Sequence, residues 1–332
     1  MMRTDRQASP SIPTAWGADP LVGQVLQGRY QLVAPLEGPG TQRVYRALQL
    51  PLERTVAVRV LAAPFEDLEA PRRFFQEARA AARLAHPHTV TVLDAGRLED
   101  GTLFVATEWL EGRTLQDVLA SGPLPWPRAV AWARALGRSL RQAHQRGVVH
   151  GDVSPGNVVL VEEAGAHVKL RGFGRTRPVM SESARLSVRE LTEGDAGLGS
   201  PAYMAPERAR HVADARGDIY SLGVVLFHML MGRVPFESED LLELVFAHHK
   251  EPPPRFSELR PELAVPEAVE AVVRRCLEKR PEQRFASMEA LLEALGDVAS
   301  RQVVPEEDAP VRAASDAHRT RGPSWWGRWR AS

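Results

Sequence analysis

Residues 149–157 read VHGDVSPGN, a polar and turn-rich stretch between two regular patterns. Before it, the apolar spacing over residues 127–146 predicts a long amphipathic helix, with a proline at its start and a glycine directly after its end. After it, short apolar runs at 157–161 and 167–170 predict two strands. We therefore expect the stretch to form a loop that joins a long helix to a pair of strands.

Two further stretches follow at wider intervals along the chain. Residues 199–207 read GSPAYMAPE, and residues 218–223 read DIYSLG. The second of these opens a strongly apolar run, 218–231, which we interpret as a buried helix. A lone His-x-Asp pattern would be a weak signal, but the three stretches in this order and at these intervals are highly specific.

On these three stretches the chain resembles a protein kinase domain of the bacterial Ser/Thr type, over roughly residues 28–298. The resemblance implies an α+β, two-lobed fold, with a small antiparallel β lobe that carries one main helix and a larger, mainly helical lobe. We assign residues 25–111 to the small lobe and the hinge, and residues 112–299 to the large lobe. Residues 1–24 and 300–332 lack periodicity and are predicted to be disordered.

The hydrophobic pattern agrees with this division into a strand-rich part and a helix-rich part. In the small lobe we expect strands at 30–33, 55–61, 89–93 and 103–108, and one helix at 72–84. In the large lobe we expect further surface helices at 266–277 and 287–298.

Composition limits the partners and the compartment. Lys+Arg and Asp+Glu both number 42, so the whole-chain charge gives no drive toward nucleic acid or an anionic membrane. The single cysteine, Cys276, rules out an intramolecular disulfide and a cysteine-based zinc site, and its helical context predicts a buried core residue. No apolar run approaches the roughly 20 residues that a spanning helix needs, so we expect a soluble, cytoplasmic protein.

The resemblance also implies roles for individual residues. Asp152 matches the catalytic base, and Asn157 matches a metal ligand. Arg59 falls where the family carries a phosphate-binding lysine, and Glu77 falls where it carries the helix glutamate that pairs with that lysine. The other nucleotide-binding positions are Val44, Ala57 and Leu160 in the pocket walls, and Glu108 and Leu110 in the hinge that bonds adenine.

The positions that handle phosphate and metal depart from the family pattern. Gly172 replaces the aspartate that holds magnesium, and glycine has no side chain to offer a cation. Losing even about 4 kcal/mol of transition-state stabilisation would slow the reaction roughly a thousandfold. Arg59 keeps a positive charge, but its planar fork is not equivalent to a lysine. The family also carries three glycines in its phosphate-binding loop. The resemblance places Glu37, Pro39 and Gln42 at those three positions in this chain.

The catalytic loop and activation segment show similar departures. Ser154 replaces the lysine that would contact the γ-phosphate, and Gly151 replaces the arginine that binds a phosphorylated activation segment. We therefore predict that phosphorylation of this segment does not switch the domain. The hydroxyl residues concerned are Ser181, Ser183, Ser187 and Thr192.

Residues that hold the shape of the fold are retained. Glu207 and Arg284 match a buried ion pair of the large lobe, and Asp218 matches the aspartate that holds the catalytic-loop backbone. His150 and Phe173 match members of the apolar spine that runs through both lobes. The loss is therefore selective, because the scaffold is kept while the residues that bind phosphate are not.

Three functions fit this pattern. The first is a pseudokinase that regulates or scaffolds another signalling protein, such as an active kinase or phosphatase. The second is a weakly active Ser/Thr kinase, in which Arg171 and Arg175 supply fixed positive charge and Asp152 and Asn157 act in catalysis rather than only in closing the loop. The third is a nucleotide sensor that does not hydrolyse ATP. In all three, ATP binding is expected to be weak and magnesium binding doubtful.

Two further motifs leave alternatives open. Residues 325–330 read WWGRWR, which would suit a membrane interface, a nucleic acid, a partner groove or an unstructured end. The pair His248 and His249 is predicted to be a solvated helix end rather than a metal site.

Overall fold

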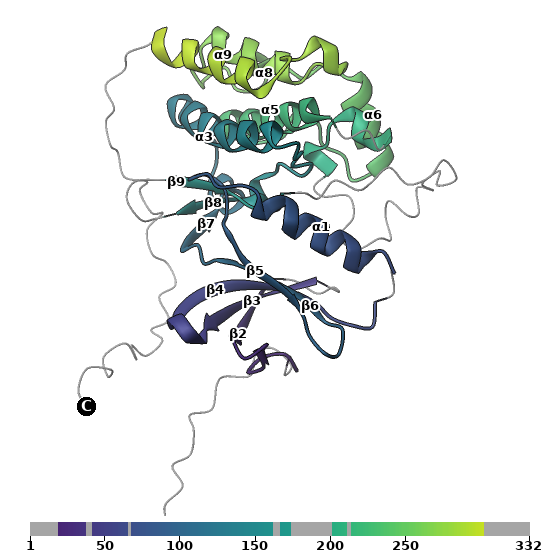
Figure 1. The fold of residues 1–332 in the computed structure, drawn as a ribbon. Coiled ribbons are helices and arrows are strands. Elements are labelled where there is room, and N and C mark those ends of the chain that lie inside the picture. Colours follow the sequence, from purple (N-terminus) through teal and green to yellow (C-terminus); the bar gives the residue numbers. More distant parts are fainter. Residues whose placement is uncertain are drawn as a thin grey trace, which may run out of the picture.

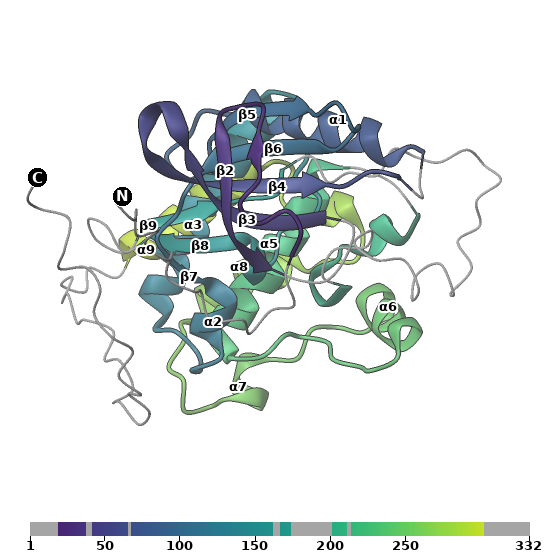
Figure 2. The same cartoon turned by 90° about the horizontal axis from the view of Figure 1, so that it is seen from below.

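The structure, a computed structural model, describes residues 19–37, 42–65, 68–161, 167–173, 201–210 and 214–301, and these form two lobes (Figure 1). The small lobe is a six-stranded antiparallel sheet in the order β1-β2-β3-β4-β6-β5. Its strands are β1 (Val25–Leu26), β2 (Tyr30–Glu37), β3 (Gln42–Gln49), β4 (Arg54–Leu61), β5 (Val92–Arg97) and β6 (Leu103–Glu108). Helix α1 (Ala70–Ala82) packs on β5 and β6, as the view from below shows (Figure 2).

The alternation of residues in β4 explains the two faces of this sheet. Val56, Val58 and Val60 are buried on one face, where they pack with aromatic residues of β2, β3 and β6. Ala57 and Arg59 therefore point to the other face. On that face Phe74 of α1 packs against Val105 of β6, so the helix covers the side of the sheet that carries Arg59.

The large lobe is helical, with one small sheet at the junction between the lobes. Its α-helices are α2 (Leu115–Leu119), α3 (Trp126–Gln145), α5 (Ala215–Met231), α6 (Leu241–Lys250), α7 (Phe256–Leu259), α8 (Glu267–Cys276) and α9 (Met288–Arg301). The sheet is β7 (Gly112–Thr114), β8 (Val158–Val161) and β9 (His167–Leu170). Short 3-10 helices span Leu50–Leu52, Pro155–Asn157, Pro201–Tyr203, Pro206–Arg210 and Pro281–Gln283.

Helix α5 is the centre of the large lobe. Nearly all of its side chains are buried, and α3, α8 and α9 contact it (Figure 1). Cys276 of α8 is fully buried against α5, as predicted, and burial raises the pKa of its thiol to about 12. In the described part of the chain, no helix combines the length and the apolarity needed to cross a membrane.

The α+β, two-lobed architecture is as the resemblance implied, but three local predictions differ. The strand expected at 89–93 lies at Val92–Arg97, because Val90 donates its backbone N–H to Leu170 and joins the other sheet. Residues 19–24, expected to be disordered, form turns in which Asp19 accepts hydrogen bonds from Tyr45 at 2.9 Å and Arg43 at 3.0 Å.

The third difference concerns His248 and His249, which were predicted to be solvated. His248 is only 3% exposed. Its Nδ1 is hydrogen-bonded to the hydroxyl of Tyr220 at 2.7 Å, and its ring meets the edge of Phe236. The prediction was wrong for His248 because the last turn of α6 is covered by the large-lobe core rather than by water.

Candidate functional site

The catalytic-loop stretch is fixed by one buried carboxylate. Asp218, in the first turn of α5, accepts hydrogen bonds from the backbone N–H groups of His150 at 2.9 Å and Gly151 at 2.8 Å. His144 of α3 lies 2.8 Å from the same carboxylate. Burial opposes the charged form, but hydrogen bonds from His144 and Gly151 outweigh it and lower the pKa of Asp218. The predicted role of Asp218 as the anchor of this loop is confirmed.

Asp152 and Asn157 lie against each other within the loop. The side-chain amide of Asn157 donates to the backbone carbonyl and to the carboxylate of Asp152, both at 2.8 Å. Ser154 is buried beside them, with its hydroxyl 3.3 Å from the same amide. Because the amide nitrogen is engaged, Asn157 has only its neutral amide oxygen to offer to a cation.

Gly172 is held next to this pair by its neighbours in the chain. The backbone N–H of Arg171 donates to the carbonyl of Asn157 at 2.9 Å, and its guanidinium donates to the carbonyl of Gly156 at 3.0 Å. Gly172 itself has φ of +86°, a left-handed conformation that most side chains disfavour. The position predicted to lack a metal ligand is therefore in direct connection with the loop of Asp152 and Asn157.

The spine residues predicted from the resemblance touch each other. The rings of His150 and Phe173 meet edge to face, with centroids 4.6 Å apart. The backbone N–H of Asp152 donates to Nδ1 of His150, so Nε2 carries the proton and donates to the carbonyl of Arg171 at 3.0 Å. This histidine therefore joins the Asp152 loop to the Gly172 segment.

In the small lobe, Arg59 of β4 and Glu77 of α1 form the predicted ion pair. Nη1 of Arg59 lies 2.9 Å from Oε2 of Glu77, and both side chains are about four-fifths buried, with exposures of 20% and 19%. The guanidinium also lies 4.6 Å from the ring centre of Phe74. These contacts hold α1 against the sheet, and the planar fork of the arginine is well suited to both of them.

The hinge is attached to the large lobe by a contact that the sequence did not indicate. Lys169 of β9 donates to both carboxylate oxygens of Glu108 at 2.7 Å, and the backbone N–H of Thr91 donates to one of them at 2.7 Å. Burial would raise the pKa of Glu108, but these hydrogen bonds outweigh it, so the pKa lies below its ordinary value. Lys169 could be recognised only once β9 and the hinge were placed side by side.

The remaining predicted nucleotide-binding residues come from both lobes. Val44 and Ala57 lie on the sheet face that carries Arg59, since Val44 pairs directly with Arg59 across β3 and β4. Leu110 follows β6, and Leu160 lies on β8. All four are half-buried. Each lobe therefore contributes half-buried apolar side chains at the positions predicted to bind adenine, and that role stays a prediction.

The residues present do not fit a magnesium site of the usual kind. A hard cation needs several oxygen ligands, and here Asn157 offers a neutral oxygen while Gly172 offers none. Among the described residues, no group of three or more acidic, histidine or cysteine side chains could hold a metal ion.

Several predicted positions lie outside the described residues. They are Pro39, Arg175, Ser181, Ser183, Ser187, Thr192 and the motif at 325–330, together with the side chains of Glu37 and Gln42.

On the large-lobe side, Arg284 connects the end of the GSPAYMAPE stretch to the core, and Arg208 directly follows that stretch. Arg284 is fully buried and bonds both carboxylate oxygens of Glu207, at 2.6 and 2.8 Å, which confirms the predicted ion pair. Arg208, which sequence analysis missed, lies within the field of Asp218, Asp152 and Glu207. Burial lowers its pKa while these carboxylates oppose the shift, so Arg208 places a positive charge close to the catalytic loop.

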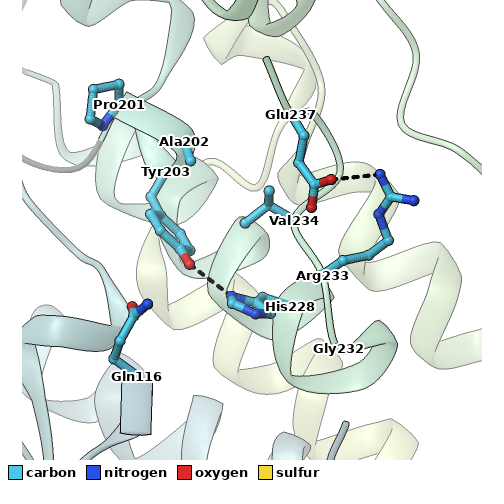
Figure 3. A pocket seen from close by; sticks show the side chains of 9 residues that line it. All are labelled: Gln116, Pro201, Ala202, Tyr203, His228, Gly232, Arg233, Val234 and Glu237. Carbon is cyan, nitrogen blue, oxygen red and sulfur yellow. Dashed lines mark hydrogen bonds and ion pairs between the residues drawn. The ribbon is translucent and has the colours of Figure 1, made fainter. Parts of the chain in front are cut away.

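A cavity of about 560 Å³ opens beside this region and was also missed (Figure 3). The hydroxyl of Tyr203 and Nδ1 of His228 are hydrogen-bonded at 2.7 Å across it, and Arg233 and Glu237 are paired at 2.8 Å on its rim. The lining residues are Gln116, Pro201, Ala202, Tyr203, His228, Gly232, Arg233, Val234 and Glu237. They come from α2, the segment after residue 200, the end of α5 and the residues that follow it, so no single stretch of sequence could indicate the cavity.

Comparison with known proteins agrees with this geometry. A family model described as protein kinase domain matches residues 38–294. The chain is 34% identical over 304 residues to the serine/threonine-protein kinase pkn3 of Myxococcus xanthus, covering 90% of this chain and 55% of that protein. It is 34% identical over 272 residues to the serine/threonine-protein kinase PrkC of Bacillus subtilis, covering 81% of this chain and 40% of that protein.

A solved structure shows the same fold. The crystal structure of the Mycobacterium tuberculosis PknI kinase domain is similar with a TM-score of 0.63 at 29% identity, covering 84% of this chain and 99% of that one. The chain spans about half the length of the first two curated relatives, whose remaining parts have no counterpart in the match.

Proposed function

This chain belongs to the protein kinase family, and from that premise we propose that it is a pseudokinase, a kinase-like domain that regulates or scaffolds another signalling protein. In this proposal the fold presents a surface to a partner, and phosphoryl transfer is lost or residual. The partner would be a signalling protein such as an active kinase or a phosphatase.

The observation that carries the proposal is Gly172. Phosphoryl transfer depends on placing phosphates and neutralising their charge, mostly with metal ions. Gly172 stands beside the Asp152–Asn157 pair with no carboxylate, and Asn157 supplies only one neutral oxygen. Metal-assisted chemistry therefore lacks its main protein ligand at this point.

The retained contacts support a folded binding module. Asp218 still holds the loop, Arg284 still holds Glu207, and Arg59 still holds α1 through Glu77. None of these three contacts requires a nucleotide. The open cavity beside Tyr203 gives such a module a concave surface of suitable size for a side chain of a protein partner.

Nucleotide binding provides the direct test. We expect adenosine, ADP and ATP to raise the thermal unfolding midpoint to similar and small extents, and magnesium to add nothing, because the hinge can hold adenine while the phosphates gain no metal contact. A strongly magnesium-dependent stabilisation by ATP, well above that by adenosine, would contradict the proposal. The same measurement with manganese in place of magnesium tests whether the site prefers a different metal ion.

A weakly active Ser/Thr kinase is the second candidate, and the position of Asp152 favours it. The carboxylate is oriented by Asn157, and Arg208 adds positive charge nearby that could partly replace a metal. Incorporation of labelled phosphate that is abolished by Asp152→Ala would establish this candidate. Incorporation that is absent, or that is sub-stoichiometric and unchanged by Asp152→Ala, would favour the pseudokinase.

A further inference from the structure

The ion pair between Glu108 and Lys169 crosses from one lobe to the other. Glu108 ends β6 of the small-lobe sheet, and Lys169 lies on β9 of the small sheet at the junction between the lobes (Figure 1). The ammonium lies 2.7 Å from both carboxylate oxygens, and the side chains of Lys169 and Glu108 are only 17% and 26% exposed. Solvent screens a charge pair at this depth only weakly, so the pair can hold the end of β6 against β9.

Glu108 is fixed by its backbone as well as by its side chain. In the sheet it is paired with Val56 of β4. Its backbone N–H donates to the carbonyl of Thr91 at 3.0 Å, and the N–H of Thr91 donates back to its carboxylate at 2.7 Å. One residue at the start of the hinge is therefore attached to β4, to the segment before β5 and, through Lys169, to β9.

The strand that carries Lys169 is bonded along both of its edges. On one edge Lys169 is paired with Val159 of β8. On the other edge the N–H of Val90 donates to the carbonyl of Leu170 at 3.0 Å, and the N–H of Leu170 donates to the carbonyl of His88 at 2.9 Å. The ammonium is therefore presented to Glu108 from a strand with neighbours on both sides.

The ion pair lies behind the positions that are predicted to hold adenine. Residues directly opposite each other in a pair of strands share a face, and successive residues alternate between the faces. Lys169 is opposite Val159, whereas Leu160, in the predicted pocket wall, is opposite Val168. Lys169 and Leu160 therefore point to opposite faces of the sheet. A ring that lies against Leu160 would not touch Lys169, so Lys169 could affect it only through Glu108 and the hinge backbone.

Glu108 connects the two walls of the predicted adenine site. Ala57 of the upper wall is paired with Thr107, the residue directly before Glu108. Leu160 of the lower wall is on β8, which pairs with the strand that carries Lys169. The spacing of the two walls and the direction of the hinge N–H and C=O groups thus depend on how Glu108 is held. Hydrogen bonds from the hinge to a bound ring would weaken steeply if these groups were misaligned.

We propose that Lys169 is a positioning residue for the hinge. By holding the carboxylate of Glu108, it fixes the hinge backbone relative to β8 and sets the spacing between Ala57 and Leu160. The inference deepens the proposed function and rests on the adenine site expected there. It gives that site a shape that depends on neither magnesium nor phosphate, because every contact that sets it is made within the chain.

Isothermal titration with adenosine tests the proposal. Lys169→Met keeps the unbranched stem and removes the ammonium, and we expect it to weaken adenosine binding about fivefold or more. Lys169→Arg should stay within about twofold of the wild type, because a guanidinium can also donate to both carboxylate oxygens. Adenosine binding in Lys169→Met as tight as in the wild type would overturn the proposal.

Lys279→Met is the matched control for a general loss of stability. Its ammonium is also half-buried, and it donates to the carbonyls of Ala247 and His248 at the end of α6. Figures 1 and 2 both place α6 well away from β9. We expect Lys279→Met to lower the free energy of unfolding in urea and to leave the dissociation constant of adenosine unchanged. An equal loss of adenosine affinity in both methionine variants would overturn the proposal.

Glu108→Gln shows whether the two side chains act together. If Lys169 acts through the carboxylate of Glu108, then Lys169→Met, Glu108→Gln and the double variant should weaken adenosine binding by the same factor, within about twofold. Effects that multiply in the double variant would overturn the proposal, because Lys169 would then act by another route.

Amide hydrogen exchange without nucleotide tests the hinge itself. In Lys169→Met, exchange over residues 108–112 should be about fivefold faster than in the wild type, and in Lys279→Met it should not change. Unchanged hinge exchange in Lys169→Met would overturn the proposal. If the wild type binds no adenosine but its hinge exchange responds to Lys169→Met, the positioning role is supported and the adenine site is contradicted, so the two failures are distinguishable.

Discussion

Gly172 is the residue at which this chain departs most from phosphoryl-transfer chemistry. Its φ of +86° is a conformation that glycine adopts freely and that Asp and Asn tolerate better than most other residues. The backbone is therefore already shaped to accept a short polar side chain beside Asn157. A single substitution can test whether the missing carboxylate is what separates this site from a metal-binding one.

We predict that Gly172→Asp lowers the free energy of unfolding by about 1 kcal/mol, because a side chain is added at positive φ. The variant should in return gain magnesium-dependent stabilisation by ATP, of about 2.7 kcal/mol when ATP exceeds its dissociation constant a hundredfold. Thermal unfolding with and without magnesium measures both effects. Gly172→Asn is the matched control, because asparagine imposes the same backbone strain and carries no charge. A magnesium effect of equal size in Gly172→Asn would contradict the prediction.

Arg59 and Glu77 make the second residue-scale test. Their ion pair is about four-fifths buried, and Phe74 adds a contact with the guanidinium face. A double-mutant cycle of Arg59→Met and Glu77→Gln should give a coupling free energy of about 1 kcal/mol. Denaturant unfolding of the four proteins measures it. Arg72 and Glu69 form an exposed pair that serves as the control, with coupling near zero expected; equal coupling in both pairs would show that burial adds nothing.

At the scale of elements, the catalytic loop depends on α5 because Asp218 satisfies two backbone N–H groups that the loop cannot satisfy itself. In Asp218→Asn, an NH2 group replaces one of the two oxygens. That NH2 group would face a backbone N–H, so two hydrogen-bond donors would point at each other. We expect Asp218→Asn to lower the free energy of unfolding by about 3 kcal/mol, because buried donors lose their acceptor. Hydrogen exchange at His150 and Gly151 should rise in the same variant.

The pH dependence of this anchor follows from the lowered pKa of Asp218. A carboxyl whose pKa is lower in the folded state contributes stability that is complete above its unfolded pKa, near 3.8, and is lost as the pH falls below it. Between pH 5 and pH 2, the free energy of unfolding should therefore fall less steeply in Asp218→Asn than in the wild type. The same slope in both proteins would assign acid unfolding to other groups.

Elements with local signals could be predicted from the sequence, and elements set by distant contacts could not. Strands β6 and β9 lie at the predicted residues, and α3 begins and ends within one residue of its prediction, since the signals at its ends are local. Strand β5 was displaced because Val90 pairs with Leu170, about 80 residues away. The start of such a strand depends on hydrogen bonds to residues far away in the sequence, and the local hydrophobic pattern does not contain that information.

The candidate site divides in the same way. The Arg59–Glu77 and Glu207–Arg284 pairs and the Asp218 anchor were predicted because family motifs mark both partners. The Glu108–Lys169 pair and the cavity at Tyr203 were missed, because each needs two or three elements in their folded positions. The motifs therefore locate the chemistry, while the fold determines what surrounds it.

For the whole molecule, histidines that are neutral in the folded state couple stability to pH well above the range of the carboxylates. Burial lowers the pKa of His86, His88, His228 and His248, which lie in both halves of the large lobe and at its junction with the small lobe. A histidine whose pKa is lower in the folded state contributes stability that is complete above its unfolded pKa and is lost as the pH falls toward the folded value. The molecule should therefore weaken between about pH 6.5 and pH 4.

His248 should contribute most to this loss. Its pKa is lowered from 6.5 to about 4, which corresponds to no more than about 3 kcal/mol, reached near pH 4. Burial is the main cause, and the nearby positive charge of Lys279 acts in the same direction, because both disfavour a second proton on the ring. We predict that His248→Gln is less stable than the wild type at pH 8, through loss of the Tyr220 contact, but that this deficit shrinks or reverses by pH 5.

Urea unfolding at both pH values measures the change in the free energy of unfolding. The control is His249→Gln, on the same helix turn, which should keep the wild-type pH dependence. A deficit in His248→Gln that stays constant between pH 8 and pH 5 would show that His248 is not the group that titrates.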